Sequence, residues 1–124
     1  MADEWRVEFY REERGSEPVA EFIRQLGANP RLQARILWTI DLLRQFGTEL
    51  PMPYSAPVAG HDFRELRVQS RNDIARVFYV AAIGRRMVLL HGFVKKTQKA
   101  PRRELATAQR RLTELLGRGG NRND

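Results

Sequence analysis

Three apolar segments separated by very short polar breaks occupy the second half of the chain, and their spacing strongly limits the possible folds. The segments are Phe63–Val68, Ile74–Ile83 and Met87–Val94, and they are rich in the β-branched and aromatic residues that favour strands. The breaks at Ser70–Asn72 and Gly84–Arg85 are too short to contain a crossover helix. The pattern therefore predicts two consecutive antiparallel hairpins. Because the third segment is apolar on both faces, we expect its strand to be central in the sheet.

The first half of the chain predicts one strand followed by two helices. Trp5–Tyr10 alternates apolar and polar residues, which is the period of a half-buried strand. We expect Ser16 to cap the first helix, with Pro18 in its first turn. Asn29 and Pro30 are expected to begin the second helix in the same way. The short connection between the helices predicts a helical hairpin that covers one face of the sheet.

The remaining segments complete the predicted domain. Thr48–Gly60 contains three prolines and is expected to be an irregular loop, and Pro101 is expected to start a third helix. The predicted order β-α-α-β-β-β-α describes a small α+β domain over residues 1–116, with a mostly antiparallel sheet and a C-terminal helix. Residues 117–124 are polar and glycine-rich, and we expect them to form a flexible tail.

Composition excludes several classes of function. The chain has 124 residues, enough for one domain, and it contains no cysteine, so disulfides and thiolate metal sites are excluded. His61 and His91 are thirty residues apart with no metal-binding companion motif, and we predict neither a metal nor a cofactor. No apolar run is long enough to span a bilayer, and the charged N-terminus lacks the apolar region of a secretory signal. These features predict a cytoplasmic protein that does not bind membranes.

Positive charge is concentrated in one part of the chain. Residues 63–103 contain eleven Lys and Arg and only two acidic residues, whereas the formal charge of the whole chain is +7. The rest of the chain is therefore slightly acidic. A basic surface on rigid strands suits a polyphosphate backbone, because each cation that pairs with a phosphate releases condensed counterions. The charge distribution thus favours RNA or DNA as a partner.

The order of residues inside this basic segment resembles a known family. ELRVQSRNDIARVFY, followed by IGRRMVLLHGFVKKTQKAP, is similar to the phage-derived, HigB-like branch of the RelE/HigB toxins from bacterial type II toxin–antitoxin operons. The resemblance is strongest from about Phe63 to Glu104. It implies a compact ribonuclease-like α+β fold and cleavage of messenger RNA in the ribosomal decoding site. It also implies inhibition by an antitoxin, commonly a helix-turn-helix protein of the HigA type in this branch.

The chemistry of such cleavage suggests which residue types the site needs. RNA is cut without metal when its 2′-hydroxyl attacks the adjacent phosphorus. The enzyme must then remove a proton, neutralise the transition state and protonate the leaving oxygen. Guanidinium groups suit the second task because they bond two phosphate oxygens and stay charged. Strand periodicity places Arg76 and Phe78 on one face and Val77 and Tyr79 on the other.

Individual roles follow from the resemblance. It assigns phosphate stabilisation to Arg67 and Arg76, at the positions of the family's strand arginines. It places Lys95 and Lys96 where relatives keep a basic or imidazole group, so one of them is expected to transfer a proton. A lysine near other cations can have a pKa low enough to act as a base. The sequence offers no clear glutamate–histidine acid/base pair at the strand ends.

Four further residues are candidate RNA contacts: Arg71, Tyr79, His91 and Lys99. Simpler interpretations stay open for several candidates. Ion pairs with Glu65 would explain Arg67 and Arg76, and a core histidine bonded to a backbone carbonyl would explain His91. We also expect His91 to share a strand face with Leu89.

Two alternative functions remain at this point. The ParE branch, which resembles this chain in scaffold, inhibits DNA gyrase as a non-catalytic protein binder. The chain is alternatively an inactive relic that binds its antitoxin but no longer cuts RNA. The lysines at the end of the last strand favour the nuclease, because a protein binder has no need for convergent cations there.

Overall fold

The sheet at the centre of the fold has five strands in the order β1-β5-β4-β3-β2. The computed structural model describes residues 4–96 and 101–118. Strand β1 is parallel to β5, and all other neighbouring strands are antiparallel. Strand β5 is an interior strand, between β1 and β4, as expected from its apolar sequence. The strands are β1 Arg6–Phe9, β2 Ser55–Pro57, β3 Arg64–Ser70, β4 Asp73–Ala82 and β5 Arg86–Lys95.

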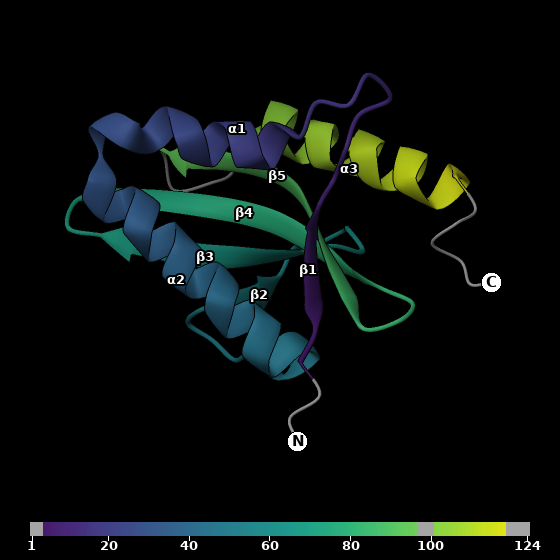
Figure 1. Cartoon of the computed structure of the whole chain (residues 1–124), viewed down its shortest axis with the longest axis horizontal. Coiled ribbons are helices and arrows are strands. Elements are labelled where there is room, and N and C mark those ends of the chain that lie inside the picture. The colour runs from purple at the N-terminus through teal and green to yellow at the C-terminus, as the bar shows by residue number, and fades with distance from the viewer. Residues whose placement is uncertain (1–3, 97–100, 119–124) are drawn as a thin grey trace.

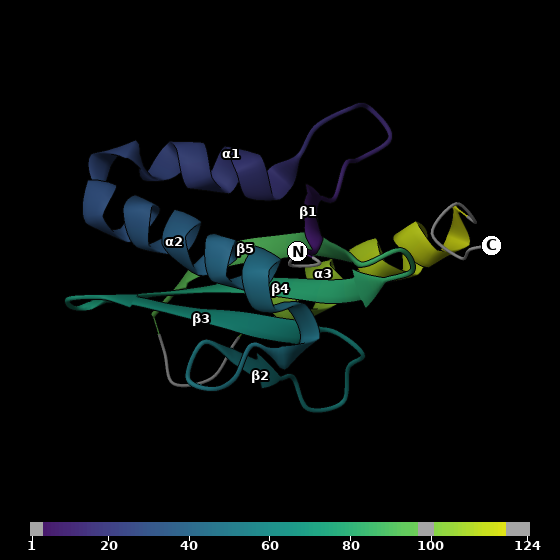
Figure 2. The ribbon, with the colours of Figure 1, turned by 60° about the horizontal axis from the view of Figure 1, so that its bottom comes forward.

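Helices cover both faces of this sheet (Figures 1 and 2). Helices α1 (Pro18–Gln25) and α2 (Pro30–Phe46) form the predicted hairpin on one face, here called the hairpin face. Helix α3 (Arg102–Gly117) packs on the opposite face, here called the α3 face. Short 3₁₀ turns, η1 (Leu26–Ala28) and η2 (Gly47–Glu49), follow α1 and α2. The α+β prediction is confirmed. No helix within the described ranges is long and apolar enough to cross a membrane.

Each face of the sheet has its own apolar core, and the alternation of β4 separates them. Val77 and Tyr79 join the core beneath the helical hairpin. Phe78 lies in the core beneath α3, where Phe63 and Leu112 contact the same cluster. The period-2 side-chain pattern therefore assigned the faces of β4 correctly.

Helix α2 begins and ends where the sequence indicates. The side chain of Asn29 accepts a hydrogen bond from the backbone N–H of Leu32 (3.3 Å), and Pro30 occupies the first turn. At the other end Gly47 adopts a φ of 56°, and the Trp5 ring occupies the space that a Cβ would need. A larger residue at position 47 would meet both obstacles.

The predicted cap of α1 is wrong. The N-cap residue is Glu17, which makes no side-chain capping bond, and the Ser16 hydroxyl instead donates to a carboxylate oxygen of Glu21 (3.0 Å). Pro18 does occupy the first turn, as expected. Because Pro18 lacks an N–H, this helix start has one fewer donor for a cap to satisfy.

The proline-rich segment is not wholly irregular, which corrects the loop prediction. Ser55–Pro57 forms strand β2 and pairs with the first part of β3, from Arg64 to Leu66. A proline is tolerated there because β2 is an edge strand. Beyond Leu66, the N–H of Arg67 donates to the carbonyl of Tyr54 (2.8 Å), and β2 extends no further. Among the described residues, no strand pairs with this edge of β3 beyond Leu66.

A β-bulge in β5 corrects the predicted facing of His91. Phe78 pairs with His91 whereas the next residue, Tyr79, pairs with Leu89, so Leu90 is the extra residue. Leu89 therefore joins the hairpin-face core, while Leu90 joins the α3-face core. A bulge redirects side chains in this way, and here it turns His91 toward α3.

Candidate functional site

Three cations converge on the α3 face near the end of the sheet. Arg67 of β3 is the register partner of Arg76 of β4, and Lys95 of β5 is the partner of Ile74, two residues before Arg76. Glu65, two residues before Arg67, faces the same side. Arg67, Arg76 and Lys95 together with Glu65 are called the cationic cluster below. Its members come from three adjacent strands, so the sheet fixes their relative positions.

Glu65 holds both arginines of the cluster. Its Oε1 accepts from Nη1 of Arg76 at 2.8 Å, and its Oε2 accepts from Nε of Arg67 at 2.9 Å. Glu65 is only 6% exposed, and the side chains of Arg76 and Arg67 are 13% and 38% exposed. The ion pairs considered from the sequence are therefore present. One carboxylate faces three cations, however, so the cluster keeps an excess of positive charge.

Arg76 has further bonding capacity. Within residues 4–96 and 101–118, its Nε is buried and has no hydrogen-bond partner. A buried donor that is left unsatisfied costs free energy, and such groups often belong to sites that bind a ligand. Arg67 is the more exposed of the two arginines.

The environment of Lys95 lowers the pKa of its amine. Burial lowers the pKa of its amine below the ordinary 10.5, and the nearby charges of Arg76 and Arg67 lower it further, against the opposing effect of Glu65. At any given pH, the neutral fraction of Lys95 is therefore larger than that of a free lysine. A neutral amine beside two guanidinium groups can accept a proton from a bound substrate.

A histidine–glutamate pair links β5 to α3 on the same face of the sheet. Nε2 of His91 lies 2.5 Å from Oε1 of Glu104, in the first turn of α3, and Nδ1 lies 3.1 Å from Nη1 of Arg111. Arg111 also donates to the carbonyl of Leu90 (2.9 Å). A Glu–His pair that was not predicted from the sequence therefore links β5 to α3. The interpretation of His91 as bonded to a backbone carbonyl is wrong, because its ring nitrogens contact the side chains of Glu104 and Arg111.

The neighbours of His91 determine its tautomer. A guanidinium can only donate, so Nδ1 must accept from Arg111 and the proton must lie on Nε2, which donates to Glu104. Burial lowers the pKa of His91 most, Arg111 lowers it as well, and Glu104 opposes both. The ring is therefore neutral and has both nitrogens engaged. It positions α3 against β5 near the cationic cluster.

This arrangement predicts a pH-dependent stability. Just below pH 6.5, about the pKa of an unperturbed histidine, His91 becomes protonated in the unfolded chain but stays neutral in the native state. The free energy of unfolding should then fall as pH decreases through 6.5, until the lower native pKa is reached. Thermal melting between about pH 7.5 and pH 5.5 measures this slope, in a range above the titration of most carboxylates. His91→Gln should flatten the slope, and an unchanged slope in that variant would contradict the assignment.

The sequence of the chain matches one known protein family. Residues 21–113 match the family model described as phage-derived protein Gp49-like (DUF891). The chain belongs to this family. Gp49-like proteins are associated with RelE/HigB-like toxins, which points to a toxin–antitoxin toxin with an antitoxin partner. No curated protein matches the chain. The matched segment runs from α1 to α3 and includes the whole cationic cluster and the His91–Glu104 pair.

The other sequence-predicted residues of this Gp49-like protein lie in different environments. Lys96 is exposed immediately after the end of β5, and Arg71 is exposed in the β3–β4 turn with a φ of 55°. Tyr79 is 2% exposed in the hairpin-face core, and its hydroxyl lies 2.5 Å from Oγ of Ser55. It is a core residue, and its ring is not available to stack on a base. Lys99 lies outside the described residues.

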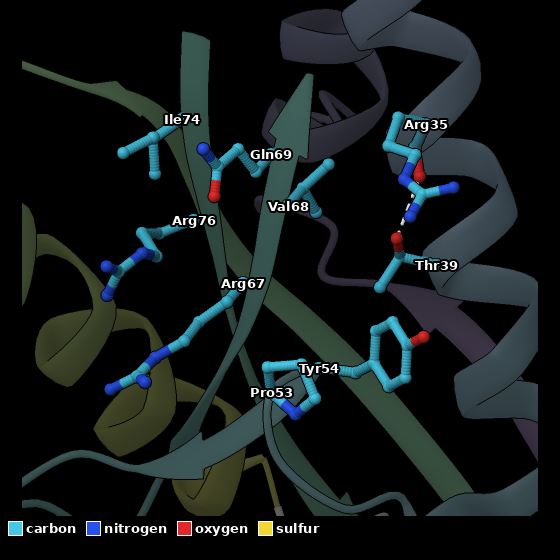
Figure 3. A pocket seen from close by; sticks show the side chains of 9 residues that line it. All are labelled: Arg35, Thr39, Pro53, Tyr54, Arg67, Val68, Gln69, Ile74 and Arg76. Carbon is cyan, nitrogen blue, oxygen red and sulfur yellow. Dashed lines mark hydrogen bonds between the residues drawn. The ribbon is translucent and has the colours of Figure 1, made fainter. Parts of the chain in front are cut away.

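A cavity of about 430 Å³ adjoins the cationic cluster at the free edge of β3. Figure 3 shows Arg67 and Arg76 extending together to one side of β3, with Arg35 of α2 and Tyr54 on the other side. Arg35 and Tyr54 were not predicted from the sequence, because neither belongs to the basic strand segment. Thr39, Pro53, Val68, Gln69 and Ile74 complete the lining.

Proposed function

We propose that this Gp49-like protein is a HigB-like toxin of a type II toxin–antitoxin system that cleaves messenger RNA on the ribosome. The observation that carries the proposal is the convergence of Arg67, Arg76 and Lys95 around the buried carboxylate of Glu65. Two fixed guanidinium groups beside an amine of lowered pKa form a set suited to metal-independent phosphoryl transfer from RNA.

The proposed reaction begins with attack of a ribose 2′-hydroxyl on the adjacent phosphorus. Neutral Lys95 removes the hydroxyl proton, and the new O–P bond forms as the bond to the 5′-oxygen breaks. Arg67 and Arg76 neutralise the charge that develops on the phosphoryl oxygens. The proton taken up by Lys95 is then available to the leaving 5′-oxygen. The products are a 2′,3′-cyclic phosphate and a 5′-hydroxyl end, and no oxidant, metal or cofactor is needed.

Glu65 acts in this proposal by holding the guanidinium groups in place. Its two oxygens bind one arginine each, so both guanidinium groups are fixed before RNA arrives. Lys96 and Arg71, which are exposed near the same end of the sheet, are proposed to contact phosphates further along the RNA. The cognate antitoxin is proposed to be a helix-turn-helix protein, and the site of action is the cytoplasm.

Primer extension on a defined transcript after a short induction pulse in cells tests this function. Wild-type protein should produce cuts within translated codons, and Arg67→Ala should remove them. Arg67 suits this test because its side chain is partly exposed and Glu65 keeps Arg76 when Arg67 is removed. Arg24→Ala, an exposed arginine of α1 on the hairpin face, is the matched control and should cut like wild type.

Other outcomes of the same measurement would contradict the proposal. Intact messenger RNA alongside arrested growth would favour the gyrase-inhibiting binder. Intact messenger RNA with normal growth would indicate an inactive relic. Cuts that persist in Arg67→Ala would place the active site elsewhere.

A further inference from the structure

The free edge of β3 connects the cationic cluster to the opposite side of the sheet. Strand β2 covers β3 only as far as Leu66, so the following residues leave an opening beside α2. The cavity at this opening is lined by Arg67 and Arg76 of the cluster and also by Arg35 and Tyr54. The cavity therefore has lining residues on both sides of β3, with Arg67 and Arg76 on one side and Arg35 on the other (Figure 3).

On the α2 side of this cavity, Arg35 and Tyr54 both contact the ring of Trp38, and these three side chains are called the platform below. The guanidinium carbon of Arg35 lies 4.2 Å from the centre of the Trp38 ring, and Tyr54 meets the same ring edge-on at 5.8 Å. Trp38 is 42% exposed, which is unusual for a tryptophan with a purely structural role. The backbone carbonyl of Arg35 accepts a hydrogen bond from the Thr39 hydroxyl (2.8 Å).

We propose that this cavity binds one unpaired nucleotide of the RNA that flanks the cut, a role that rests on the function proposed above. The base stacks against Tyr54 and the guanidinium plane of Arg35, and its phosphate lies toward Arg67. The volume falls within the range of about 300–1,000 Å³ typical of small-ligand sites. The exposed amide of Gln69 can both donate to and accept from a base edge, so it is placed to distinguish one base from another.

The composition of the walls favours RNA over a peptide at this place. Stacking on aromatic rings and arginine planes, combined with cations along the backbone, is the recognition mode of single-stranded nucleic acid. The cavity provides three arginines and a tyrosine, and two of those arginines belong to the cationic cluster. An extended peptide at the free β3 edge would use the backbone of β3 and would have no particular use for the Arg35–Trp38 stack.

The test is binding of a fluorescently labelled, 2′-O-methylated mixed-sequence oligoribonucleotide, which lacks the attacking hydroxyl and cannot be cut by the proposed reaction. Arg35→Ala and Trp38→Ala should each raise the dissociation constant about tenfold or more, in line with the loss of a stacking platform. Arg31→Ala, which removes another exposed arginine of α2, should change it much less. Because Trp38→Ala changes no charge, its effect separates stacking from electrostatic attraction. Equal melting temperatures would confirm that the variants fold.

Three results would overturn the nucleotide site. If Arg35→Ala binds like Arg31→Ala while Arg67→Ala binds weakly, the cavity does not bind the base, although the proposed function stands. If the oligoribonucleotide does not bind while cells still show codon-directed cuts, the same conclusion follows. If RNA binding is unchanged but Arg35→Ala and Trp38→Ala no longer copurify with the antitoxin, the cavity is a peptide site. Absence of cuts in cells would instead refute the proposed function itself.

Discussion

Replacing Glu65 with alanine is expected to lower the free energy of unfolding by about 3–5 kcal/mol, the usual cost of removing one partner from a buried ion pair. Glu65 is 6% exposed and accepts from two arginines, so its loss leaves Arg67 and Arg76 facing each other without a counter-ion. Arg76 suffers most, because its side chain is 13% exposed and its buried Nε already lacks a partner among the described residues.

Urea unfolding followed by circular dichroism measures this change. Glu13→Ala removes an exposed glutamate and should alter stability by no more than about 0.5 kcal/mol. The double variant Glu65→Ala/Arg76→Met should recover part of the loss, because it removes the isolated buried charge as well. A loss below about 1 kcal/mol in Glu65→Ala, or no recovery in the double variant, would show that the pair is not a buried electrostatic unit.

The cationic cluster was largely predictable because it depends on local strand geometry. Alternation within each strand places Arg67 on the same face as Glu65, and short hairpins bring Arg76 next to Arg67. The last strand follows after a second short turn, which brings Lys95 to the same end of the sheet. Period and turn length are sufficient to bring Arg67 and Arg76 together. Lys95 reaches the same face only because the bulge at Leu90 shifts the rest of β5 by one residue.

Features that depend on how distant elements pack were not predictable in this way. The bulge at Leu90 reverses the facing expected from alternation, and only the register with β4 reveals it. The His91–Glu104 pair depends on where α3 packs, which the spacing of the two residues does not determine. For Tyr79, alternation correctly predicted the face of β4 opposite to that of Arg76. Its burial depends on the helices that pack on that face, and alternation does not predict it.

The cavity wall was missed for a similar reason. Arg35 and Trp38 lie on the exposed side of a helix where the sequence shows only an apolar stripe with charged neighbours. Their importance arises because Tyr54, from the proline-rich segment, packs beside them at the free edge of β3. That edge exists only because β2 is short, and the sequence predicted no strand there at all.

Replacing Lys95 with alanine is expected to lower the single-turnover rate of RNA cleavage on programmed ribosomes by about 10²–10⁴-fold, the range for loss of a general base. Lys95→Arg should not restore the rate. A guanidinium keeps the positive charge but stays protonated at any usable pH, so it cannot accept the 2′-hydroxyl proton. Substantial rescue by arginine would assign Lys95 to charge stabilisation instead of proton transfer.

The pH profile gives a second, independent check of the same role. If neutral Lys95 is the base, the wild-type rate should rise with pH until the pKa of its amine is passed. Burial and the neighbouring charges of Arg76 and Arg67 lower that pKa, so removing Arg67 should raise it. The residual single-turnover rate of Arg67→Ala on programmed ribosomes, which is too slow to leave visible cuts after a short pulse in cells, should therefore have its rising limb at higher pH than the wild-type rate. Arg24→Ala should leave the limb in place, because its charge lies on the other side of the sheet. A rising limb that stays fixed in Arg67→Ala would mean that a group other than Lys95 removes the proton.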